Sequence, residues 1–334
     1  MWYPLARAAL FQFEPETAHH VALGGLRWAE RMGFMQRWPQ PPAQPVSVLG
    51  LSFPNPVGLS AGLDKNGDYI DAMAALGFGF LEIGTTTPRP QPGNPQPRMF
   101  RLPAAGAIIN RLGFNNDGVD ALVRNVQRAK FAGILGINIG KNADTPVENA
   151  ADDYLICLEK VYAHASYITV NISSPNTQGL RSLQGEAALQ RLLAVLKSKQ
   201  LELAATHGKY VPLLVKIAPD LALVEVESMA KVFLEQGIDG VIATNTTIGR
   251  QAVAGLPYAD EAGGLSGRPV RESATRVLRE MNAALDGKLP LIGVGGIANA
   301  DSAAEKIHAG ASLLQVYTGF IYEGPDVIRQ AILG

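Results

Sequence analysis

Eight short β-rich runs alternate with helix-length amphipathic stretches along this chain, and this alternation restricts the fold more than any other feature. Most of the runs are apolar on both faces, as expected of parallel strands that are covered on both sides. The runs are Pro56–Gly62, Phe80–Thr85, Ile134–Gly140, Tyr167–Ser173, Val211–Ile217, Gly240–Thr246, Leu289–Gly296 and Leu313–Gly319. The clearest helical stretches are Asn116–Lys130, Val147–His164, Ala187–Thr206, Leu223–Gln236 and Pro269–Asp286.

An eightfold strand–helix alternation is typical of a (β/α)8 barrel, so we predict an α/β fold of the TIM-barrel type. A doubly wound open sheet is the alternative, but eight units and the lack of a GxGxxG motif after the first strand disfavour it. The composition is 47% hydrophobic and 18% charged, which fits a soluble globular protein with a sizeable core. The net charge of −1 gives no indication of a nucleic-acid partner.

The single cysteine, Cys157, excludes a disulfide within the chain and indicates a buried thiol in a reducing compartment. No window reaches the roughly 18 uninterrupted apolar residues of a membrane span. The N-terminus lacks the basic-then-apolar order of a signal peptide and does not resemble a transit peptide. We therefore expect no targeting segment and no membrane-spanning helix.

The first 40 residues differ from the rest, and we predict a helical segment over 1–40 and a barrel domain over 41–334. Pro4–Phe13 and Pro15–Arg31 each suit a short helix with proline near its start, and residues 38–45 suit an extended linker. The helices either cap the bottom of the barrel, which the pattern alone favours, or turn an apolar face to lipid or a hydrophobic ligand. The apolar sets at helical spacing are Trp2, Leu5, Ala9, Leu10 and Phe13, and Val21, Ala22, Gly25, Leu26 and Trp28.

Polar side chains gather at the ends of the predicted strands, where the chemistry of such barrels takes place. One asparagine or lysine at a strand end is usually a turn residue, but a ring of them that face one another predicts a polar site. No metal site is predicted. The polar residues at these ends include Asp64, Lys65, Thr85, Asn138, Asn171, Ser174, Asn176, Lys216, Thr244, Asn245 and Thr246.

Glycine-rich turns follow the last two strands. Gly295-Gly296 and Thr318-Gly319 would expose backbone N–H groups at the usual phosphate site of a barrel. The loop Gly263–Arg268 adds another glycine-rich wall. These turns predict a phosphate-bearing substrate or cofactor, with flavin mononucleotide (FMN) as one candidate, and tight packing turns are the structural alternative.

Lys216, in a predicted strand, has two functional interpretations. It could form a Schiff base in a phosphate-binding lyase, or its ammonium group could stabilise negative charge on a reduced flavin. Amides favour the second interpretation, because each offers an acceptor beside a donor and so matches the alternating C=O and N–H groups of a cyclic ureide. The candidate amides are Asn110, Asn171, Asn176 and Asn245.

Taken together, these motifs resemble the dihydroorotate dehydrogenase family over essentially the whole chain. The resemblance favours the class 2, quinone-dependent branch, because Ser174 stands where class 1 enzymes carry cysteine and because the helical extension matches that branch. A class 1 enzyme linked to fumarate or NAD remains an alternative, as does the lyase. The motifs are Ala61–Lys65, Asn110–Asn115, Asn138–Lys141, Asn171–Thr177, Val215–Asp220, Thr244–Thr247, Gly263–Pro269 and Gly293–Ile297.

The resemblance implies oxidation of (S)-dihydroorotate to orotate in pyrimidine (UMP) biosynthesis, with one bound FMN and a membrane quinone as electron acceptor. Ser174 would take the proton from C5 while hydride leaves C6 for flavin N5. The implied substrate contacts are Lys65, Asn110, Arg111, Leu112, Gly113, Phe114, Asn171, Asn176, Asn245 and Thr246. The implied flavin contacts are Ala61, Gly62, Leu63, Asp64, Lys65, Thr85, Asn138, Asn171, Lys216, Thr244, Gly267, Gly296, Tyr317 and Thr318.

A serine hydroxyl is a weak base, so Ser174 needs a dry pocket and a route for the proton through water or a neighbouring hydroxyl. Residues 177–185 are a plausible lid. The resemblance also favours the lipid-facing interpretation of the N-terminal helices, with His19, Arg101 and Tyr317 as quinone contacts. It implies a monomer attached peripherally to the cytoplasmic face of a bacterial cell membrane.

Overall fold

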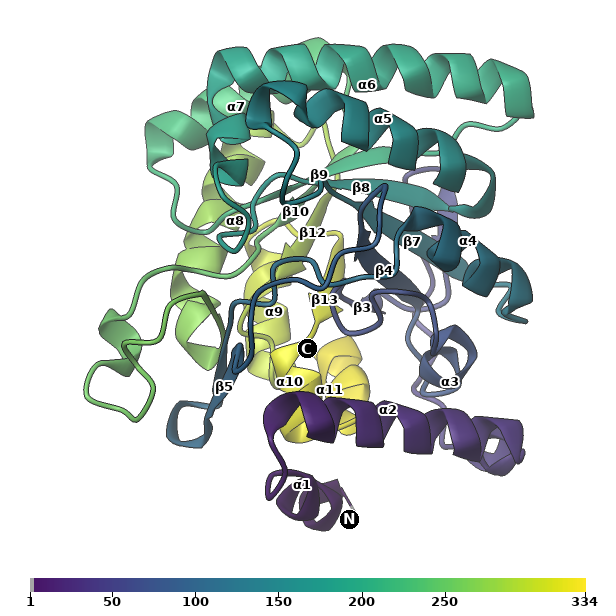
Figure 1. Cartoon of the computed structure of the whole chain (residues 1–334), viewed down its shortest axis with the longest axis vertical. Coiled ribbons are helices and arrows are strands. Elements are labelled where there is room, and N and C mark those ends of the chain that lie inside the picture. Colours follow the sequence, from purple (N-terminus) through teal and green to yellow (C-terminus); the bar gives the residue numbers. More distant parts are fainter. Residues whose placement is uncertain (1–2) are drawn as a thin grey trace.

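A computed structural model describes residues 3–334 of the chain, so Trp2 of the first apolar set lies outside the described residues. Eight parallel strands close into a barrel with the neighbour order β10-β12-β13-β3-β4-β7-β8-β9, which confirms the predicted TIM barrel (Figure 1). Each strand falls within or overlaps a predicted run. The strands are β3 (Val57–Leu59), β4 (Phe80–Thr86), β7 (Ile134–Ile139), β8 (Tyr167–Asn171), β9 (Leu213–Ile217), β10 (Gly240–Ala243), β12 (Leu291–Val294) and β13 (Leu313–Val316).

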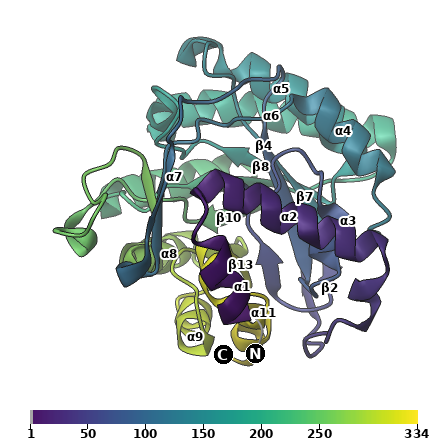
Figure 2. The same ribbon diagram turned by 60° about the horizontal axis from the view of Figure 1, so that its bottom comes forward.

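Helices surround the barrel, and the five predicted most clearly all form. Shorter helices complete the ring after the first and the last two strands (Figures 1 and 2). The predicted five are α4 (Val119–Arg128), α5 (Ala150–Val161), α6 (Glu186–His207), α7 (Leu223–Gln236) and α8 (Arg271–Leu285). The shorter ones are α3 (Ile70–Ala74), α9 (Ala300–His308), α10 (Thr318–Glu323) and α11 (Asp326–Leu333).

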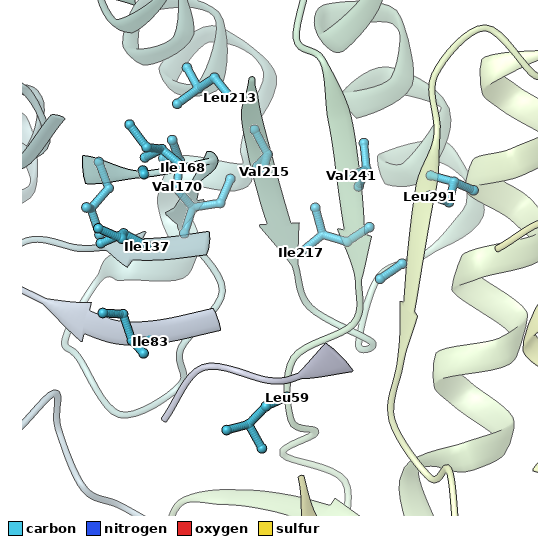
Figure 3. Packing of buried hydrophobic residues seen from close by; sticks show 14 of the residues in the cluster. Leu59, Ile83, Ile137, Ile168, Val170, Leu213, Val215, Ile217, Val241 and Leu291 are labelled. Atoms are coloured by element: carbon cyan, nitrogen blue, oxygen red, sulfur yellow. The ribbon is translucent and has the colours of Figure 1, made fainter. Parts of the chain in front are cut away.

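Outward-facing strand residues form the main core between the barrel and its helices. Successive side chains on a strand point to opposite faces, so every second residue meets the helices. These side chains are branched and fully or almost fully buried, and each contributes about 1.5–3 kcal/mol through burial. Figure 3 shows Leu59, Ile83, Ile137, Ile168, Val170, Leu213, Val215, Ile217, Val241 and Leu291 of this layer.

The lower part of the barrel interior is filled by aromatic side chains that two glycines make room for. An ideal Cβ on Gly58 would lie 2.4 Å from the Phe80 ring, and one on Gly136 would lie 2.1 Å from the Tyr167 ring. The Phe80 ring also contacts Phe53 of the hairpin described next, at 5.2 Å between ring centroids. The interior is therefore a packed core in its lower half and leaves space only above it.

A two-stranded hairpin of β1 (Val46–Val48) and β2 (Leu51–Phe53) closes the bottom of the barrel. Its apolar side chains pack on the inner cluster that contains Phe53, Phe80 and Tyr167. The prediction that the N-terminal helices cap the bottom is therefore wrong. The hairpin occupies that position because it follows directly on the extended linker and presents alternating apolar residues to the open end.

A three-stranded antiparallel sheet lies apart from the barrel strands and was not predicted. It consists of β5 (Met99–Leu102), β6 (Ala107–Asn110) and β11 (Gly264–Gly267) in the order β11-β6-β5. Gly264 pairs with Asn110, so residues that we interpreted as a glycine-rich loop form a strand. The pairing joins segments more than 150 residues apart, and such long-range partners decide strand formation more than local propensity does.

The N-terminal segment forms helices α1 (Tyr3–Leu10) and α2 (Pro15–Arg31), as predicted, followed by a short 3-10 helix, Phe34–Arg37. Helix α1 packs beside α10, and α2 contacts β5. Helix α2 also packs against α3 (Figure 2). None of the helices in residues 3–334 has the length and apolar character needed to cross a bilayer. The boundary at residue 40 between the two predicted domains stays a prediction.

Candidate functional site

One pocket lies at the C-terminal ends of the barrel strands. Its empty volume, open mouth included, is about 990 Å³. The lining comes from the ends of seven barrel strands or the loops after them, and from β6 and β11. The predicted residues that line it are Ala61, Gly62, Lys65, Thr85, Asn110, Leu112, Gly113, Phe114, Asn171, Ser174, Asn176, Lys216, Thr244, Asn245, Thr246, Gly267, Gly296, Tyr317 and Thr318.

The four asparagines form two hydrogen-bonded pairs. Asn176 donates through Nδ2 to Oδ1 of Asn110 at 3.2 Å, which ties the loop after β8 to the end of β6. Asn245 donates through Nδ2 to Oδ1 of Asn171 at 3.3 Å, which joins the ends of β10 and β8. Among the described residues, the first pair leaves Nδ2 of Asn110 and Oδ1 of Asn176 free for a planar ligand with alternating donors and acceptors, whereas the second pair is bonded further to Thr85, Ser173 and the Thr246 backbone N–H.

Ser174 lies in the loop after β8 and is buried. Its Oγ accepts the backbone N–H of Asn176 at 3.2 Å. Among the described residues, no carboxylate or imidazole is hydrogen-bonded to this hydroxyl. The hydroxyl of Thr177, three residues further along the chain, is buried and has no hydrogen-bond partner in the described part of the chain. The two hydroxyls therefore have donor and acceptor capacity to spare.

The segment that we predicted as a lid, residues 177–185, contains a 3-10 helix, Leu180–Gln184. Arg181 anchors it: the guanidinium donates to the carbonyl oxygens of Ser173 at 3.0 Å and Thr246 at 2.9 Å. The same side chain pairs with Asp220 at 2.8 Å. In this structure the segment is closed over the loop that carries Ser174.

Lys216 forms part of the pocket floor. It projects inward from β9, and its ammonium group donates to Oγ of Ser60 at 3.0 Å. Glu82 of β4 lies beneath it, with 3.9 Å between Nζ and Oε1. Burial lowers the pKa of Lys216, and the Glu82 charge opposes that shift. The result is a cation directly below the space that a ligand would fill.

Glycines shape the wall formed by β11 and by the loop after β12. A Cβ on Gly296 would lie 2.5 Å from the Arg271 backbone, and one on Gly267 would lie 2.3 Å from the Gly106 carbonyl oxygen. Both residues have positive φ, which non-glycine residues rarely adopt. Beside them the Thr318 hydroxyl donates to Oγ of Ser266 at 2.8 Å. At both positions the absence of a side chain lets the backbone pack closely against its neighbours, and both glycines line the pocket together with Thr318.

The loop after β3 carries Lys65 into the pocket. Loss of hydration lowers the pKa of Lys65 to about 8, and the Glu16 carboxylate of α2 opposes that shift. Asp64 points away and accepts the backbone N–H groups of Asp68 and Tyr69 at 2.9 and 2.8 Å. Asp64 thus holds the loop in shape, and Lys65 is the charged group that faces the ligand space.

Six predicted site residues do not line the pocket. Leu63 is a core side chain and Asp64 caps its loop, while Asn138 lies one layer below, between Thr85 and Glu82. The Arg111 guanidinium turns outward to Glu261 at 2.5 Å. The quinone candidates His19 and Arg101 belong to α2 and β5.

Sequence reasoning missed several polar residues of the site. Ser60, Ser266 and Gln315 line the pocket, and Glu82 lies under it. The signal was present for two of them. Glu82 and Gln315 each interrupt an otherwise apolar strand at an inward-facing position, and a buried polar residue there needs a partner.

The comparisons with known proteins agree with this geometry. The family model described as "Dihydroorotate dehydrogenase" matches residues 44–333. Two relatives named "Dihydroorotate dehydrogenase (quinone)" are each 60% identical over 332 residues: that of Thiobacillus denitrificans, with 99% of this chain and 98% of the relative covered, and that of Acinetobacter baylyi, with 99% of each covered.

Among solved structures, the crystal structure of DHODH from Eimeria tenella in complex with ferulenol superimposes with a TM-score of 0.85 at 39% identity. The match covers 95% of this chain and 89% of that one. A ligand-free structure of the same parasite's enzyme matches with a TM-score of 0.83 at 40% identity, over 93% of this chain and 92% of that one. The resemblance inferred from the motifs is confirmed, and the chain belongs to the dihydroorotate dehydrogenase family.

Proposed function

We propose that this protein oxidises dihydroorotate to orotate with a bound FMN and passes the electrons to a membrane quinone. The observation that carries the proposal is the convergence of two asparagine pairs, the Ser174 hydroxyl and the Lys216 ammonium on one pocket. The names of the full-length relatives support the quinone as acceptor.

The residues present fit a flavin nucleotide. Gly267, Gly296 and the Thr318 hydroxyl all line one side of the pocket, and this glycine-rich wall would hold the phosphate. At the other end, Lys216 would lie at the polar edge of the ring system. Gln315 adds a buried Oε1 that has no hydrogen-bond partner among the described residues. An acceptor left free at the floor of a pocket suits a ring N–H.

A bound flavin supplies one capability, the acceptance of a hydride from C6 of the substrate. The chain does the rest. The asparagine pairs hold the flat ureide edge, and Lys65 offers a positive charge to the substrate carboxylate. Ser174 takes the proton from C5 and passes it on through water or a neighbouring hydroxyl, for which the buried Thr177 hydroxyl, unpartnered among the described residues, is the proposed candidate. The closed segment around Arg181 keeps water from competing for that proton.

The Schiff-base alternative is less consistent with the geometry. An amine must lose its proton to attack a carbonyl. Lys216 lies 3.9 Å from a carboxylate and donates to Ser60, and both contacts favour the charged form. The same contacts suit a lysine that acts through its charge.

The N-terminal helices are the proposed site of quinone entry and of peripheral attachment to the cytoplasmic face of the membrane. Their exposed apolar side chains include Leu5, Phe13, Trp28 and Phe34. Arg101 stacks on the Phe11 ring at 4.5 Å and donates to the carbonyl oxygens of Leu10 and Phe13. Burial lowers the pKa of His19 to about 3, so a neutral imidazole would face the quinone. Tyr317, which lines the pocket, would contact both the flavin and the quinone.

A test of the acceptor uses the full chain, dihydroorotate and three acceptors in parallel: a ubiquinone analogue, fumarate and NAD. We expect orotate to form at a rate at least about 100-fold higher with the quinone. Comparable rates with fumarate or NAD would contradict the assignment to the quinone-dependent branch. Formation of no orotate with any acceptor would contradict the activity itself.

A further inference from the structure

A buried carboxylate lies at the centre of the barrel, below the proposed flavin site, and has no role in the reaction described above. Glu82 projects inward from β4 and its side chain is fully buried. Ionised carboxylates are almost never fully buried unless they are paired and hydrogen-bonded, because desolvation costs several kcal/mol. Its surroundings therefore need an explanation.

Four side chains donate hydrogen bonds to Glu82. Oε1 accepts from Nδ2 of Asn138 at 2.8 Å. Oε2 accepts from the Tyr167 hydroxyl at 2.9 Å, from Oγ1 of Thr169 at 3.2 Å and from Nε2 of Gln315 at 2.7 Å. An ionised carboxylate can only accept hydrogen bonds, and here donors from three other strands surround both of its oxygens. Such an environment stabilises the negatively charged form of the side chain.

Lys216 is the cation nearest to this charge. Its Nζ lies 3.9 Å from Oε1, and the two side chains are 5% and 0% exposed. Ser60 after β3 accepts the hydrogen bond of Lys216, and Asn171 on β8, Thr244 and Asn245 after β10 and Gln315 on β13 are neutral groups of the same pocket, in which Lys65 is the other charged lining residue. Burial lowers the pKa of Lys216, and within residues 3–334 Glu82 is the one charged group that raises it.

We propose that Glu82 is the fixed counter-charge that keeps Lys216 in its ammonium form at the pocket floor, and that it thereby acts as a positioning residue for the redox site. A buried lysine without a partner tends to give up its proton rather than stay charged. A neutral amine at this place would lose the ability to stabilise negative charge above it. The effect on the flavin rests on the proposed function, whereas the effect on Lys216 does not.

The hydrogen-bond network gives Glu82 a second task. Asn138 bridges Glu82 to Oγ1 of Thr85 at 2.6 Å, and Thr85 accepts from Nδ2 of Asn171 at 2.9 Å. The orientation of the Asn171 amide is thus fixed by a chain that starts at the carboxylate. Fixing the lysine charge and orienting an amide at the ligand edge both require the carboxylate in this position.

The direct test is carbon NMR of the full-length protein as purified, labelled at Cε of lysine, with the Lys216 signal assigned by its loss in Lys216→Met. We expect Lys216 to be an ammonium at pH 7.5 in the native chain. In Glu82→Gln its titration should move to lower pH. Tyr167→Phe, which removes one hydrogen bond but no charge, should leave that titration unchanged.

An unchanged Lys216 titration in Glu82→Gln, or a neutral Lys216 in the native chain, would overturn the proposal. An equal shift in Tyr167→Phe would also overturn it, because the hydrogen bonds and not the charge would then be responsible. If Glu82→Gln does not fold, the double variant Glu82→Gln/Lys216→Met decides. Recovery of folding there supports the charge pair, since it removes an uncompensated buried cation; failure to recover contradicts it.

A second readout connects the pair to the flavin. In the alkaline range where Lys216 of Glu82→Gln has lost its proton, the midpoint potential of the bound flavin should lie below that of the native protein. As the pH falls and Lys216 regains its charge, the potential should rise to the native value or above it, because the negative charge of Glu82 is then missing. A potential that is higher at every pH would show that Glu82 acts only through its own charge. A colourless protein would contradict the proposed function, while the NMR result would still stand or fall by itself.

Discussion

In the proposed reaction some side chains of the pocket bind the substrate, and Ser174 takes the proton. Replacing it by alanine should slow reduction of the flavin by dihydroorotate by about 100-fold or more, the usual range for a lost general base. The flavin absorbance of the variant should be unchanged, because Ser174 is not among the proposed flavin contacts. Stopped-flow absorbance measures both quantities.

Ser182→Ala is the matched control for this variant. It lies on the neighbouring closed segment, and its hydroxyl donates only to the local Gly179 carbonyl oxygen, at 2.6 Å. We expect it to reduce the flavin at a rate within about twofold of the native protein. A native rate in Ser174→Ala would remove Ser174 from its role as the base.

Lys65 makes substrate binding depend on pH. Its pKa is lowered to about 8, mainly by burial, so its ammonium form prevails below that value and is lost as the pH rises through it. Since the substrate carboxylate needs the charge, KM for dihydroorotate should rise above about pH 8. A serine base should make kcat rise with pH over the same range. A KM that stays constant from pH 7 to 9.5, measured with saturating quinone, would contradict the role of Lys65.

The depressed pKa of Lys65 also has a consequence for stability. A lysine whose pKa is lower in the folded state than in the unfolded one binds fewer protons when folded, between about pH 8 and the unfolded value near 10.5. The buried ammonium group of Lys65 therefore lowers the free energy of unfolding below about pH 8. This destabilisation is lost as the pH rises from about 8 to 10.5. Substrate binding reverses part of that penalty, which links affinity and stability at this residue.

Individual residues also show what the sequence alone does and does not predict. Lys216, Ser174, Asn171 and Asn245 lie on or directly after barrel strands, and the barrel rule places such residues together without knowledge of any contact. Arg111 belongs to the same motif as Asn110, yet its guanidinium turns outward to Glu261, 150 residues away in sequence. A motif gives the position of a residue on the chain, whereas the direction of a long side chain depends on partners that only the folded molecule brings near.

Helix α2 is joined to the loop before β5 by a buried ion pair. Arg98 donates to Glu16 through Nε and Nη2 at 2.9–3.1 Å, and also to the carbonyl oxygens of Pro92 and Asn94. Asn94 in turn donates to the Arg111 carbonyl oxygen at 2.8 Å, next to the pocket wall. Helix α2 is thereby linked to residues 111–114, the segment after β6 that contains pocket-lining residues.

Replacing Glu16 by glutamine leaves Arg98 as an uncompensated buried charge, which should cost about 3–5 kcal/mol. We expect the loss to appear locally, as faster hydrogen exchange in residues 14–31, and as a lower rate of quinone reduction with flavin reduction preserved. Glu202→Gln removes an exposed pair with Lys199 and should change neither quantity. Equal hydrogen exchange in Glu16→Gln and the native chain would contradict this linkage.

Some helices and strands could be predicted from the sequence and others could not, and the difference has a physical reason. The barrel strands and α7 follow from local apolar patterning, since each buries both faces or one stripe. The sheet β11-β6-β5 and the hairpin that closes the barrel bottom do not, because their strands are short and are stabilised by partners distant in sequence or by the inner cluster. Hydrophobic periodicity contains no information about such partners.

The inside of the barrel depends on Gly58 and Gly136 as much as on its aromatic residues. Gly136→Ala would push a methyl group into the Tyr167 ring, at 2.1 Å for an ideal Cβ, and should destabilise the protein by about 1–3 kcal/mol. Gly24 lies within α2, and an ideal Cβ there would meet no atom within 4 Å outside its chain neighbours and the helix backbone. Gly24→Ala should therefore stabilise the protein by about 0.5–1 kcal/mol. Chemical denaturation of the two variants, with opposite signs of the change, checks this account of the core.

The whole molecule is a barrel with the proposed redox site at one end and a helical extension that exposes apolar side chains. Trp28 is 60% exposed and Phe34 63%, with ring centroids 5.7 Å apart, so they form a compact apolar surface on the extension. Replacing both by serine should abolish sedimentation with anionic lipid vesicles and lower the rate with a long-chain quinone. Val224→Ser, an equally exposed position on α7, is the control. Unchanged vesicle binding in the double variant would place the membrane surface elsewhere.

The central claim, that the strand-end residues bind a flavin and reduce it with dihydroorotate, is tested most directly by anaerobic absorbance of the purified full-length protein. We predict a yellow protein with about one flavin per chain, bleached by dihydroorotate as an equivalent amount of orotate forms, and restored by a quinone. A colourless protein that borohydride links to its substrate through Lys216, or a yellow one that dihydroorotate does not bleach, would contradict the claim.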